Sequence, residues 1–335
     1  MDVTFAICCR NGERHLKEVL EALRSQKGVE RDRWEILLVD NGSTDGTAAI
    51  FESVSQRAGN APAMRSVREP EAGQRAARKC AVQNARGAWL CFVDDDNVLD
   101  EHYLARGLVF AATANKVGAF GGASVARLDR SPPPHFAGFA SSLAVWSGGG
   151  VAKDIGLNRK FTAGLFVLRA VAIEAMSGPW LMPGRTPACP FGGEDAELCI
   201  QLVRLGWKIW YVPGLVFEHI IPANRMRLGY LASLRARQGG EELMLNLAYG
   251  PGGASLFGLW LLQVLRALPR LVFFLGMFAV PLRGTRWKNL SIALFQAGFF
   301  QYTPVALSKA GSFRRVACKP PRSTAERNNA RSETT

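Results

Sequence analysis

Three consecutive carboxylates, Asp94, Asp95 and Asp96, directly follow the apolar run Trp89–Val93. Neighbouring like charges raise one another's pKa and repel, so such a cluster is costly unless a positive group lies on it. Carboxylate oxygens suit Mg²⁺ or Mn²⁺, which usually keep coordination positions for substrate phosphates. The cluster therefore indicates a site for a hard divalent cation, with a solvated acidic turn capping the next helix as the alternative.

Two further groups have side chains suited to acid–base or ligand chemistry. Glu194 and Asp195 stand in the first turn of a helix expected over residues 192–207, where the helix dipole favours an ionised carboxylate. A carboxylate there can act as a general base, and plain helix-start acidity is the alternative. His219 ends an apolar strand pattern and is either a ligand or a structural histidine.

The first 125 residues alternate between continuous apolar runs and helical spacing of apolar residues. The runs predict strands at 3–9, 34–40, 64–69, 88–94 and 117–125. The helical spacing predicts helices at 15–26, 43–59, 72–87 and 101–115. Short connections between alternating strands and helices predict an α/β fold, with a mostly parallel, doubly wound sheet covered by helices on both faces.

Polar loops follow three of these strands, at the sheet edge where such folds bind ligands. They are CRNGE after the first strand, DNGSTDG after the second and DDDN after the fourth. The absence of GxGxxG after the first strand, and of GxxxxGK[ST] anywhere, argues against dehydrogenase and P-loop chemistry. A phosphate-bearing ligand would instead be held by the metal, helix N-termini and basic side chains such as those of RAARK at 75–79.

The chain is less regular beyond residue 125. Residues 127–162 predict an irregular stretch, either a substrate-facing loop or a plain surface excursion. Residues 164–176 predict a strand and then a helix, and residues 208–219 predict two strands broken at Pro213-Gly214.

The net charge of +13 is concentrated at the carboxyl-terminal end. Residues 251–335 hold 12 Lys or Arg against 2 acids, whereas residues 1–250 hold 29 against 26. This distribution favours an anionic membrane surface, and without nucleic-acid-binding motifs no nucleic-acid partner is expected. The seven cysteines form no CxxC pair and predict reduced core residues in a reducing compartment, and the amino-terminal segment is typical of a first strand rather than a signal peptide.

Two apolar blocks of 12 residues, 254–265 and 271–282, lie on either side of Arg266, Pro269 and Arg270. Neither block reaches the roughly 20 residues that span a bilayer. With a third apolar segment at 290–307, they predict a helical, apolar and basic membrane-associated region over 246–318 that lies in the interface or re-enters it. Core helices of a soluble protein and a true span are the alternatives, and residues 319–335 are expected to be disordered.

Four motifs, in this order, resemble those of the inverting glycosyltransferases of family 2, which have the GT-A fold. DNGSTDGT (40–47) resembles the nucleotide loop, and AGQRAARKCAVQNARG (72–87) resembles the Gly-x-x-x-Ala-Arg-Asn helix, with Lys79 where Asn is usual. DDDN (94–97) resembles the DxD motif, and residues 192–219 resemble the Glu-Asp helix and the following strands that end in a His. The combination FVDDDN, AGLFVLR, GED, GWKIWY and HIIP looks closest to the hormogonium-polysaccharide-type subgroup.

The resemblance implies that the first two loops hold the nucleotide. Asp40 would contact the uracil of a UDP-sugar, with Glu13 and Arg78 nearby. Arg10 and Asn11, in the loop after the first strand, are included in the same binding site.

The resemblance also implies which residues hold the metal and which take the proton. Asp94 and Asp95 would approach the ribose, the sugar and the metal. Asp96, with Asp94, would bind Mn²⁺ or Mg²⁺ on the diphosphate, and His219 would complete that site. Asp195 would be the general base, with Glu194 beside it.

The implied function is a single displacement that moves a sugar from a nucleotide-sugar to a polysaccharide or lipid-linked acceptor at the inner face of a bacterial membrane. Residues 1–125 would form the nucleotide-sugar half of one domain, and residues 126–245 its acceptor and catalytic half. One alternative is a glycoside hydrolase with two carboxylates, which needs neither metal nor nucleotide. The other is a non-catalytic, transferase-like membrane assembly protein.

Overall fold

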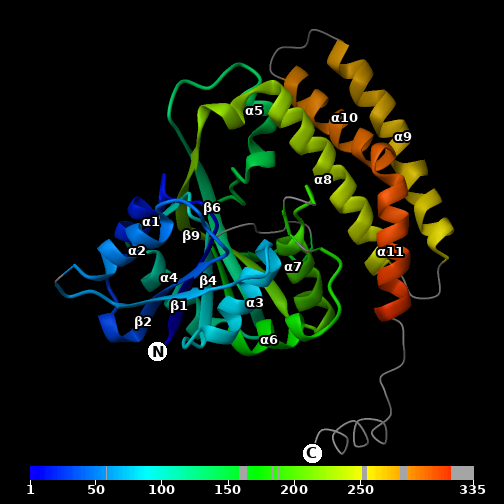
Figure 1. Ribbon diagram of the computed structural model, residues 1–335. Coiled ribbons are helices and arrows are strands. Elements are labelled where there is room, and N and C mark those ends of the chain that lie inside the picture. The colour runs from blue at the N-terminus through cyan, green and yellow to red at the C-terminus, as the bar shows by residue number, and fades with distance from the viewer. Residues whose placement is uncertain are drawn as a thin grey trace, which may run out of the picture.

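The computed structural model describes residues 1–57, 59–157, 164–182, 184–186, 189–250, 255–279 and 285–317. One nine-stranded sheet forms the centre of the α/β part, with helices on both of its faces (Figure 1). Its strand order is β3-β2-β1-β4-β8-β6-β9-β5, and β7 pairs with β9 outside this path. The strands are β1 (Val3–Cys9), β2 (Trp34–Asp40), β3 (Ala63–Arg68), β4 (Trp89–Val93), β5 (Asn97–Leu99), β6 (Val117–Leu128), β7 (Lys153–Asp154), β8 (Leu165–Leu168) and β9 (Lys208–Ile221).

The first half of the sheet is parallel, as the alternating pattern predicts. β1 pairs in parallel with β2 and β4, and β2 pairs in parallel with β3. The helices that connect these strands are present but shorter than predicted at both ends, because apolar spacing does not mark where the caps lie. They are α1 (Leu16–Arg24), α2 (Thr47–Ser55), α3 (Gln74–Asn84) and α4 (Tyr103–Thr113).

The second half of the sheet is mixed. β8 runs antiparallel to both β4 and β6, while β6 and β9 are parallel to each other. β5 and β7 are antiparallel to β9. The predicted fold class, a mostly parallel sheet with helices, is confirmed, and the antiparallel strands are the departure from a purely parallel sheet.

The prediction of two strands broken at Pro213-Gly214 is wrong, because β9 is one continuous strand through this dipeptide. The pairing of β9 with β6 jumps from Gly121↔Tyr211 to Ala123↔Val216, so the residues around Pro213 bulge opposite Gly122. A Cβ on Gly122 would lie 1.7 Å from the carbonyl oxygen of Leu215. The bulge therefore needs a glycine on the neighbouring strand.

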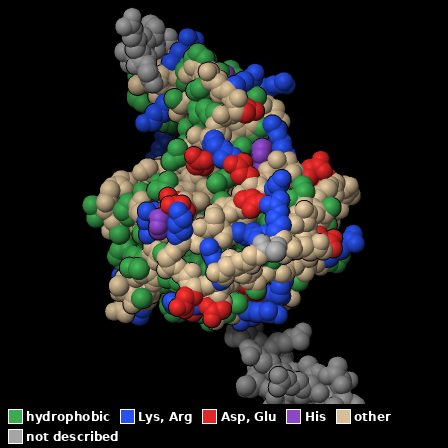
Figure 2. All heavy atoms as spheres, turned by 90° about the vertical axis from the view of Figure 1, so that its left-hand side faces the viewer, with side chains coloured by type: hydrophobic (Ala, Val, Ile, Leu, Met, Phe, Trp, Pro, Cys, Tyr) green, Lys and Arg blue, Asp and Glu red, His purple; other side chains and the backbone are tan. Residues whose placement is uncertain are grey.

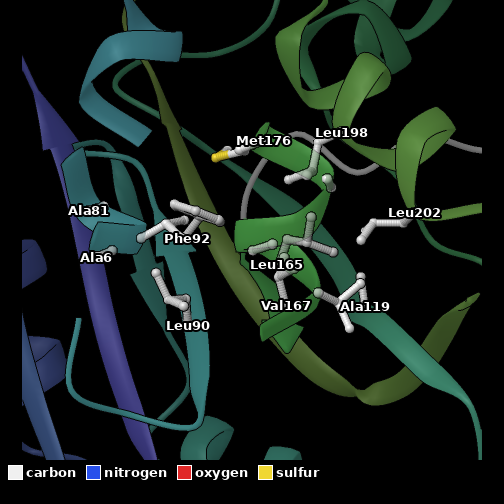
Figure 3. Close-up of a cluster of buried hydrophobic side chains, with 14 of the residues drawn as sticks. Ala6, Ala81, Leu90, Phe92, Ala119, Leu165, Val167, Met176, Leu198 and Leu202 are labelled. Atoms are coloured by element: carbon white, nitrogen blue, oxygen red, sulfur yellow. The ribbon is translucent and has the colours of Figure 1, made fainter. Parts of the chain in front are cut away.

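Two apolar layers pack on the two faces of the sheet and hold its edge in place. One face is covered by α3, α6 (Arg169–Ser177) and α7 (Glu194–Arg204), whose side chains meet those of β1, β4, β6 and β8 (Figure 3). In this layer Leu198 and Leu202 project from α7 toward Leu165 and Val167 of β8. The other face is covered mainly by α1, α2 and α4. These layers fix the start of α7 beside the carboxyl ends of β1 and β4.

The stretch at 127–162 contains more structure than the predicted irregular loop. It includes α5 (Phe136–Phe139), the 3₁₀ helix η2 (Ala140–Leu143) and β7, while residues 158–163 lie outside the described residues. Phe139 is fully buried and belongs to a cluster that also holds Leu231 and Leu234. The part of this stretch around α5 and η2 is therefore packed into the molecule, and not a plain surface excursion.

Four helices form a separate layer beside the sheet: α8 (Leu228–Tyr249), α9 (Leu256–Ala279), α10 (Arg286–Gln301) and α11 (Thr303–Ala317). The described residues of the two predicted apolar blocks around Pro269 belong to one helix, α9, which is the outermost of the four (Figure 1). By length and composition, its segment Leu256–Phe278 is the one single helix of the described chain that could cross a membrane, and α10 with α11, bent by 62°, could count as a second span. The predicted disordered tail, 319–335, lies outside the described residues.

Six cysteines fall in the described part of the chain, and all six are free thiols. Five of them are buried, as predicted for core residues, and Cys189 is half-buried. Cys318 lies outside the described residues.

We expect Gly122→Ala to destabilise the fold by about 1–3 kcal/mol, because the added methyl group collides with the Leu215 carbonyl. Urea denaturation measures the effect. Gly214→Ala, in the same bulge, is the control, because its Cβ would meet only the Cδ of Arg106, at 3.5 Å. Equal midpoints for the two variants would show that the close approach is unimportant.

Candidate active site

A cavity of about 580 Å³ lies at the carboxyl ends of β1 and β4, between the sheet edge and the starts of α7 and α8. Charged side chains of both signs gather at the waist of the molecule, between the α/β part and the helical layer (Figure 2). The charged side chains that line the cavity are Arg10, Arg78, Asp94, Asp95, Asp96, Arg185, Glu194, Asp195, His219, Arg225 and Glu241.

The three aspartates after β4 lie at the cavity wall, as predicted. Burial and the neighbouring Asp96 raise the pKa of Asp94 far above its usual value. Burial also raises the pKa of Asp95, whose Oδ2 accepts a weak hydrogen bond from the Cys9 thiol at 3.6 Å. The carboxylates after β4 are therefore crowded together, and their mutual repulsion favours a positively charged group at this point of the cavity.

Asp96 meets two positively polarised side chains from distant parts of the chain. Its Oδ2 lies 3.5 Å from His219 Nε2 and 3.0 Å from Arg225 Nη1. Burial raises the pKa of Asp96, but the hydrogen bonds and charges of His219 and Arg225 outweigh it and lower the pKa. The antiparallel pairing of β5 with β9 places Asn97 opposite His219, which brings the histidine beside Asp96.

His219 is oriented through its second ring nitrogen. Its Nδ1 lies 2.8 Å from the carbonyl oxygen of Leu143, in η2. A carbonyl accepts, so Nδ1 carries a proton and Nε2 is the nitrogen that faces Asp96. Burial lowers the pKa of His219, but Asp96 outweighs this and raises it.

The donor set at Asp96 and His219 fits a divalent cation. Among the described residues, no group of three or more His, Cys, Asp or Glu side chains is arranged to hold a metal ion. Mg²⁺ is commonly held by one or two carboxylates together with substrate phosphates, so a full protein cage is not required. The hydrogen bond from Nδ1 to a backbone carbonyl is also the partner that metal-ligating histidines usually have.

Asp195 forms a close ion pair with Arg78, between Asp195 Oδ1 and Arg78 Nη1. The Arg78 side chain is only 4% exposed, and its guanidinium lies 5.3 Å from the Phe92 ring centroid. Gly193, in the left-handed region at φ +91°, turns the chain into α7 and directs Asp195 toward the cavity. The structure thus brings Arg78 to the predicted base, beside the carboxylates after β4.

Sequence reasoning missed Glu241, which reaches the same turn from α8. The backbone N–H of Gly192 donates a hydrogen bond to Glu241 Oε1 at 2.6 Å. Burial raises the pKa of Glu241 to about 6. A Cβ on Gly192 would lie 3.6 Å from both Glu241 Oε1 and Glu194 Oε2, and 3.5 Å from Arg185 Nε. Two acids and an arginine therefore converge on the turn that carries Asp195, and the buried Glu194 Oε2 has no hydrogen-bond partner among the residues that the structure describes.

The signal for Glu241 in the sequence was its place in the pair Glu241-Glu242, directly after Gly239 and Gly240. The adjacent glycines, Gly239 and Gly240, mark the buried side of α8. A Cβ on Gly239 would lie 1.9 Å from the carbonyl oxygen of Phe295 in α10. A glycine pair followed by an acid was the available hint that the helix is buried here.

The predicted nucleotide residues separate into two groups. Arg10, Arg78, Asp94 and Asp95 line the cavity, whereas Asn11, Glu13 and Asp40 are not part of its lining.

Those three residues shape the loops beside the cavity. Asn11 Oδ1 and Glu13 Oε2 accept backbone N–H groups of Thr44 and Gly46, at 2.8 and 2.7 Å. Asp40 Oδ1 accepts the N–H of Ser43 at 2.8 Å. The loops after β1 and β2 are therefore tied together.

Residues 4–150 match the family model described as glycosyl transferase family 2. The chain therefore contains a family 2 glycosyltransferase domain over these residues. It is 26% identical over 255 residues to the succinoglycan biosynthesis protein ExoM of Rhizobium meliloti, and this match covers 72% of this chain and 75% of that protein. It is 31% identical over 106 residues to the glycosyltransferase AglE of Haloferax volcanii, covering 32% and 34% of the two chains. Neither relative carries the name of the hormogonium-polysaccharide-type subgroup, so that finer prediction is unsupported.

Two solved structures share the fold. The mannosyltransferase PcManGT from Pyrobaculum calidifontis, in complex with GDP-Man and Mn²⁺, has a TM-score of 0.52 at 18% identity, over 99% of this chain and 80% of that one. S. aureus TarS 1-349, in complex with UDP-GlcNAc, has a TM-score of 0.53 at 15% identity, over 95% and 90%. The predicted GT-A fold and transferase class are confirmed, and the glycoside hydrolase alternative is wrong.

We expect Glu241→Gln to stabilise the enzyme relative to wild type as the pH rises. The folded pKa of about 6 lies above the ordinary value of 4.5, so wild type loses stability between these values, by up to about 2 kcal/mol. Gln keeps an oxygen for the Gly192 N–H and does not ionise. Urea denaturation from pH 4 to 7.5 measures the difference.

Four groups face Glu241 and set this behaviour: Arg185, Glu194, Arg237 and the Gly192 backbone. Glu174→Gln, an exposed change on α6, is the control and should follow wild type at every pH. If the difference in free energy of unfolding between Glu241→Gln and wild type were the same at every pH in this range, Glu241 would not have the raised pKa that its burial implies.

Proposed function

We propose that this enzyme transfers a sugar from a nucleotide-sugar, with a UDP-sugar as the first candidate, to a polysaccharide or lipid-linked acceptor by a single inverting displacement. The observation that carries the proposal is one cavity with the pair Asp96–His219 and the pair Asp195–Arg78. The names of the structural neighbours include a UDP-sugar and a GDP-sugar, so both donor classes belong in the test.

The donor side is assigned to the residues after β4 and their partners. Asp96 and His219, with Asp94 beside them, would hold Mn²⁺ or Mg²⁺. When bound, the cation supplies Lewis-acid stabilisation for the charge that develops on the departing nucleoside diphosphate. Arg10 and Arg225 line the same cavity and add positive charge for phosphate oxygens.

The acceptor side is assigned to Asp195 as general base. Arg78 binds Asp195 Oδ1, which holds the carboxylate ionised and fixes its direction. Oδ2 is then the oxygen that takes the proton from the attacking acceptor hydroxyl, a contribution of roughly 10²- to 10⁴-fold. Glu194 and Glu241 position the turn that carries Asp195. One displacement inverts the configuration at the anomeric carbon.

The loops after β1 and β2 are assigned to the nucleotide. Asn11 and Glu13 fix the shape of these loops through the N–H groups of Thr44 and Gly46. Asp40 is the proposed contact for the nucleotide base, and Asp95 the proposed contact for the ribose. Residues 1–125 and 126–245 would then be the donor and acceptor halves of one domain.

The carboxyl-terminal helices are assigned to a membrane surface. Only 6% of the apolar window in α9 is buried, and residues 251–335 carry a net charge of +10. Both features favour peripheral or re-entrant association of residues 246–318 with an anionic bilayer. The free cysteines are consistent with the inner, reducing side of the cell membrane. A role in polysaccharide biosynthesis accords with the name of the Rhizobium relative.

We expect Asp195→Asn to lower kcat by roughly 10²- to 10⁴-fold while nucleotide binding is unchanged, because it removes the proton acceptor and keeps the shape of the side chain. Turnover of UDP- and GDP-sugars, with the anomeric configuration of the product read by NMR, is the measurement. Asp129→Asn, an exposed change, should retain full activity. Full turnover by Asp195→Asn, or a retained anomeric configuration, would contradict the mechanism.

We expect Asp96→Asn to abolish the increase in melting temperature that Mn²⁺ and a nucleoside diphosphate give together. The physical reason is the loss of the anionic ligand next to His219. A thermal-shift titration with and without Mn²⁺ tests this, and Asp154→Asn on exposed β7 is the control. An unchanged Mn²⁺-dependent shift in Asp96→Asn would remove Asp96 from the metal site.

A further inference from the structure

Helix α9 has its apolar side facing outward, which is the reverse of a helix on the surface of a water-soluble protein. Phe257, Leu261, Leu265, Leu268 and Val272 are 67, 40, 62, 50 and 64% exposed. At about 100° per residue, these five side chains fall within an arc of about 80° on one side of the helix. Such an apolar stripe is expected to lie against another apolar phase.

Polar side chains on the other side of α9 line a groove. Gln263, Arg266 and Arg270 lie on the side opposite the apolar stripe. They line a cavity of about 360 Å³ between α8, α9 and α10. The other polar residues of its lining are Glu242 and Asn246 from α8 and Gln296 from α10.

The groove carries more positive charge than its surroundings balance. Arg266 and Arg270 are four residues apart on one helix face, where like charges repel. Arg266 and Arg270 bring two positive charges to the groove, and Glu242 is the one acid among the described residues that line it. Two guanidinium groups with nearby amide donors match the oxygens of a phosphate group.

We propose that this groove binds the phosphate of an anionic phospholipid headgroup while the apolar stripe of α9 lies against the acyl chains. Three observations identify this occupant: the exposed apolar stripe, the arginines on the opposite side, and the net charge of +10 in residues 251–335. The stripe requires an apolar phase and the groove requires an anion, and an anionic bilayer supplies both. The inference rests on the proposed membrane association and is independent of the transfer chemistry.

The test is flotation of the full-length enzyme with phosphatidylcholine vesicles that contain or lack phosphatidylglycerol. The double variant Arg266→Gln/Arg270→Gln removes the groove charges. The double variant Lys288→Gln/Lys309→Gln removes two charges from α10 and α11 outside the groove. We expect the groove variant to lose about tenfold more affinity for phosphatidylglycerol vesicles than this charge-matched control. Equal losses would overturn the proposal, because generic surface charge would then explain the binding.

A second variant, Arg266→Lys/Arg270→Lys, keeps the charge and removes the planar fork of the guanidinium. We expect it to bind phosphatidylglycerol vesicles more weakly than wild type, and wild-type binding would overturn a defined phosphate site. Inorganic phosphate alone is the remaining probe. If it raises the melting temperature of wild type and phosphatidylglycerol gives no gain over phosphatidylcholine, the groove binds free phosphate and the lipid assignment is wrong.

The nucleoside diphosphate and Mn²⁺ thermal shift is measured on every variant. Because these arginines lie outside the catalytic cavity, this shift should be retained in all of them. Loss of vesicle binding with the nucleotide shift intact isolates the groove from the proposed transfer site. Absence of the nucleotide shift in wild type would instead contradict the proposed function and leave the vesicle comparison valid.

Discussion

The neutralisation of buried acids at the carboxyl end of β4 is the constraint on which this site depends. Asp96 is met by His219 from β9 and by Arg225 from the following turn, while Asp195 of α7 is met by Arg78 of α3. In each of these three contacts a group from the first half of the chain meets one from the second half. The charges of the site therefore also hold these two halves of the chain together, and removing one partner leaves a buried charge without compensation.

The positions of the carboxylates could be predicted from the sequence, but several of their partners could not. Asp94 to Asp96 follow an apolar strand, and strand ends share one edge of a parallel sheet, so local pattern was sufficient. The contact of Arg78 with Asp195 depends on how α3 and α7 pack across β4 and β8, and no spacing along the chain records that. The break predicted at Pro213-Gly214 failed for a similar reason, since the bulge is defined by the register against Gly122.

Helix α9 shows that the length of an apolar run does not by itself predict the length of the helix that forms. Arg266, Pro269 and Arg270 divide the run in the sequence, yet α9 continues through them. The run length ignores the side of the helix on which each residue lies. Both arginines line the groove on the side of the helix opposite the apolar stripe, so they do not interrupt the stripe. The helical period of the apolar residues, rather than the length of the apolar run, was therefore the informative signal in this segment.

Helix α8 contributes side chains both to the candidate active site and to the groove beside α9. Glu241 points to the Gly192 turn before Asp195, and the next residue, Glu242, lines the groove beside α9. A helix in a densely packed core moves as a rigid body, so a displacement on one side of α8 also displaces its other side. Gly239 and Gly240 allow α8 to lie in close contact with α10. Asp195, the proposed general base, is therefore held by the packing of α7 on the sheet and also contacted from the helical layer through Glu241, whereas Asp96 and His219, the proposed metal ligands, lie at β5 and β9 of the sheet.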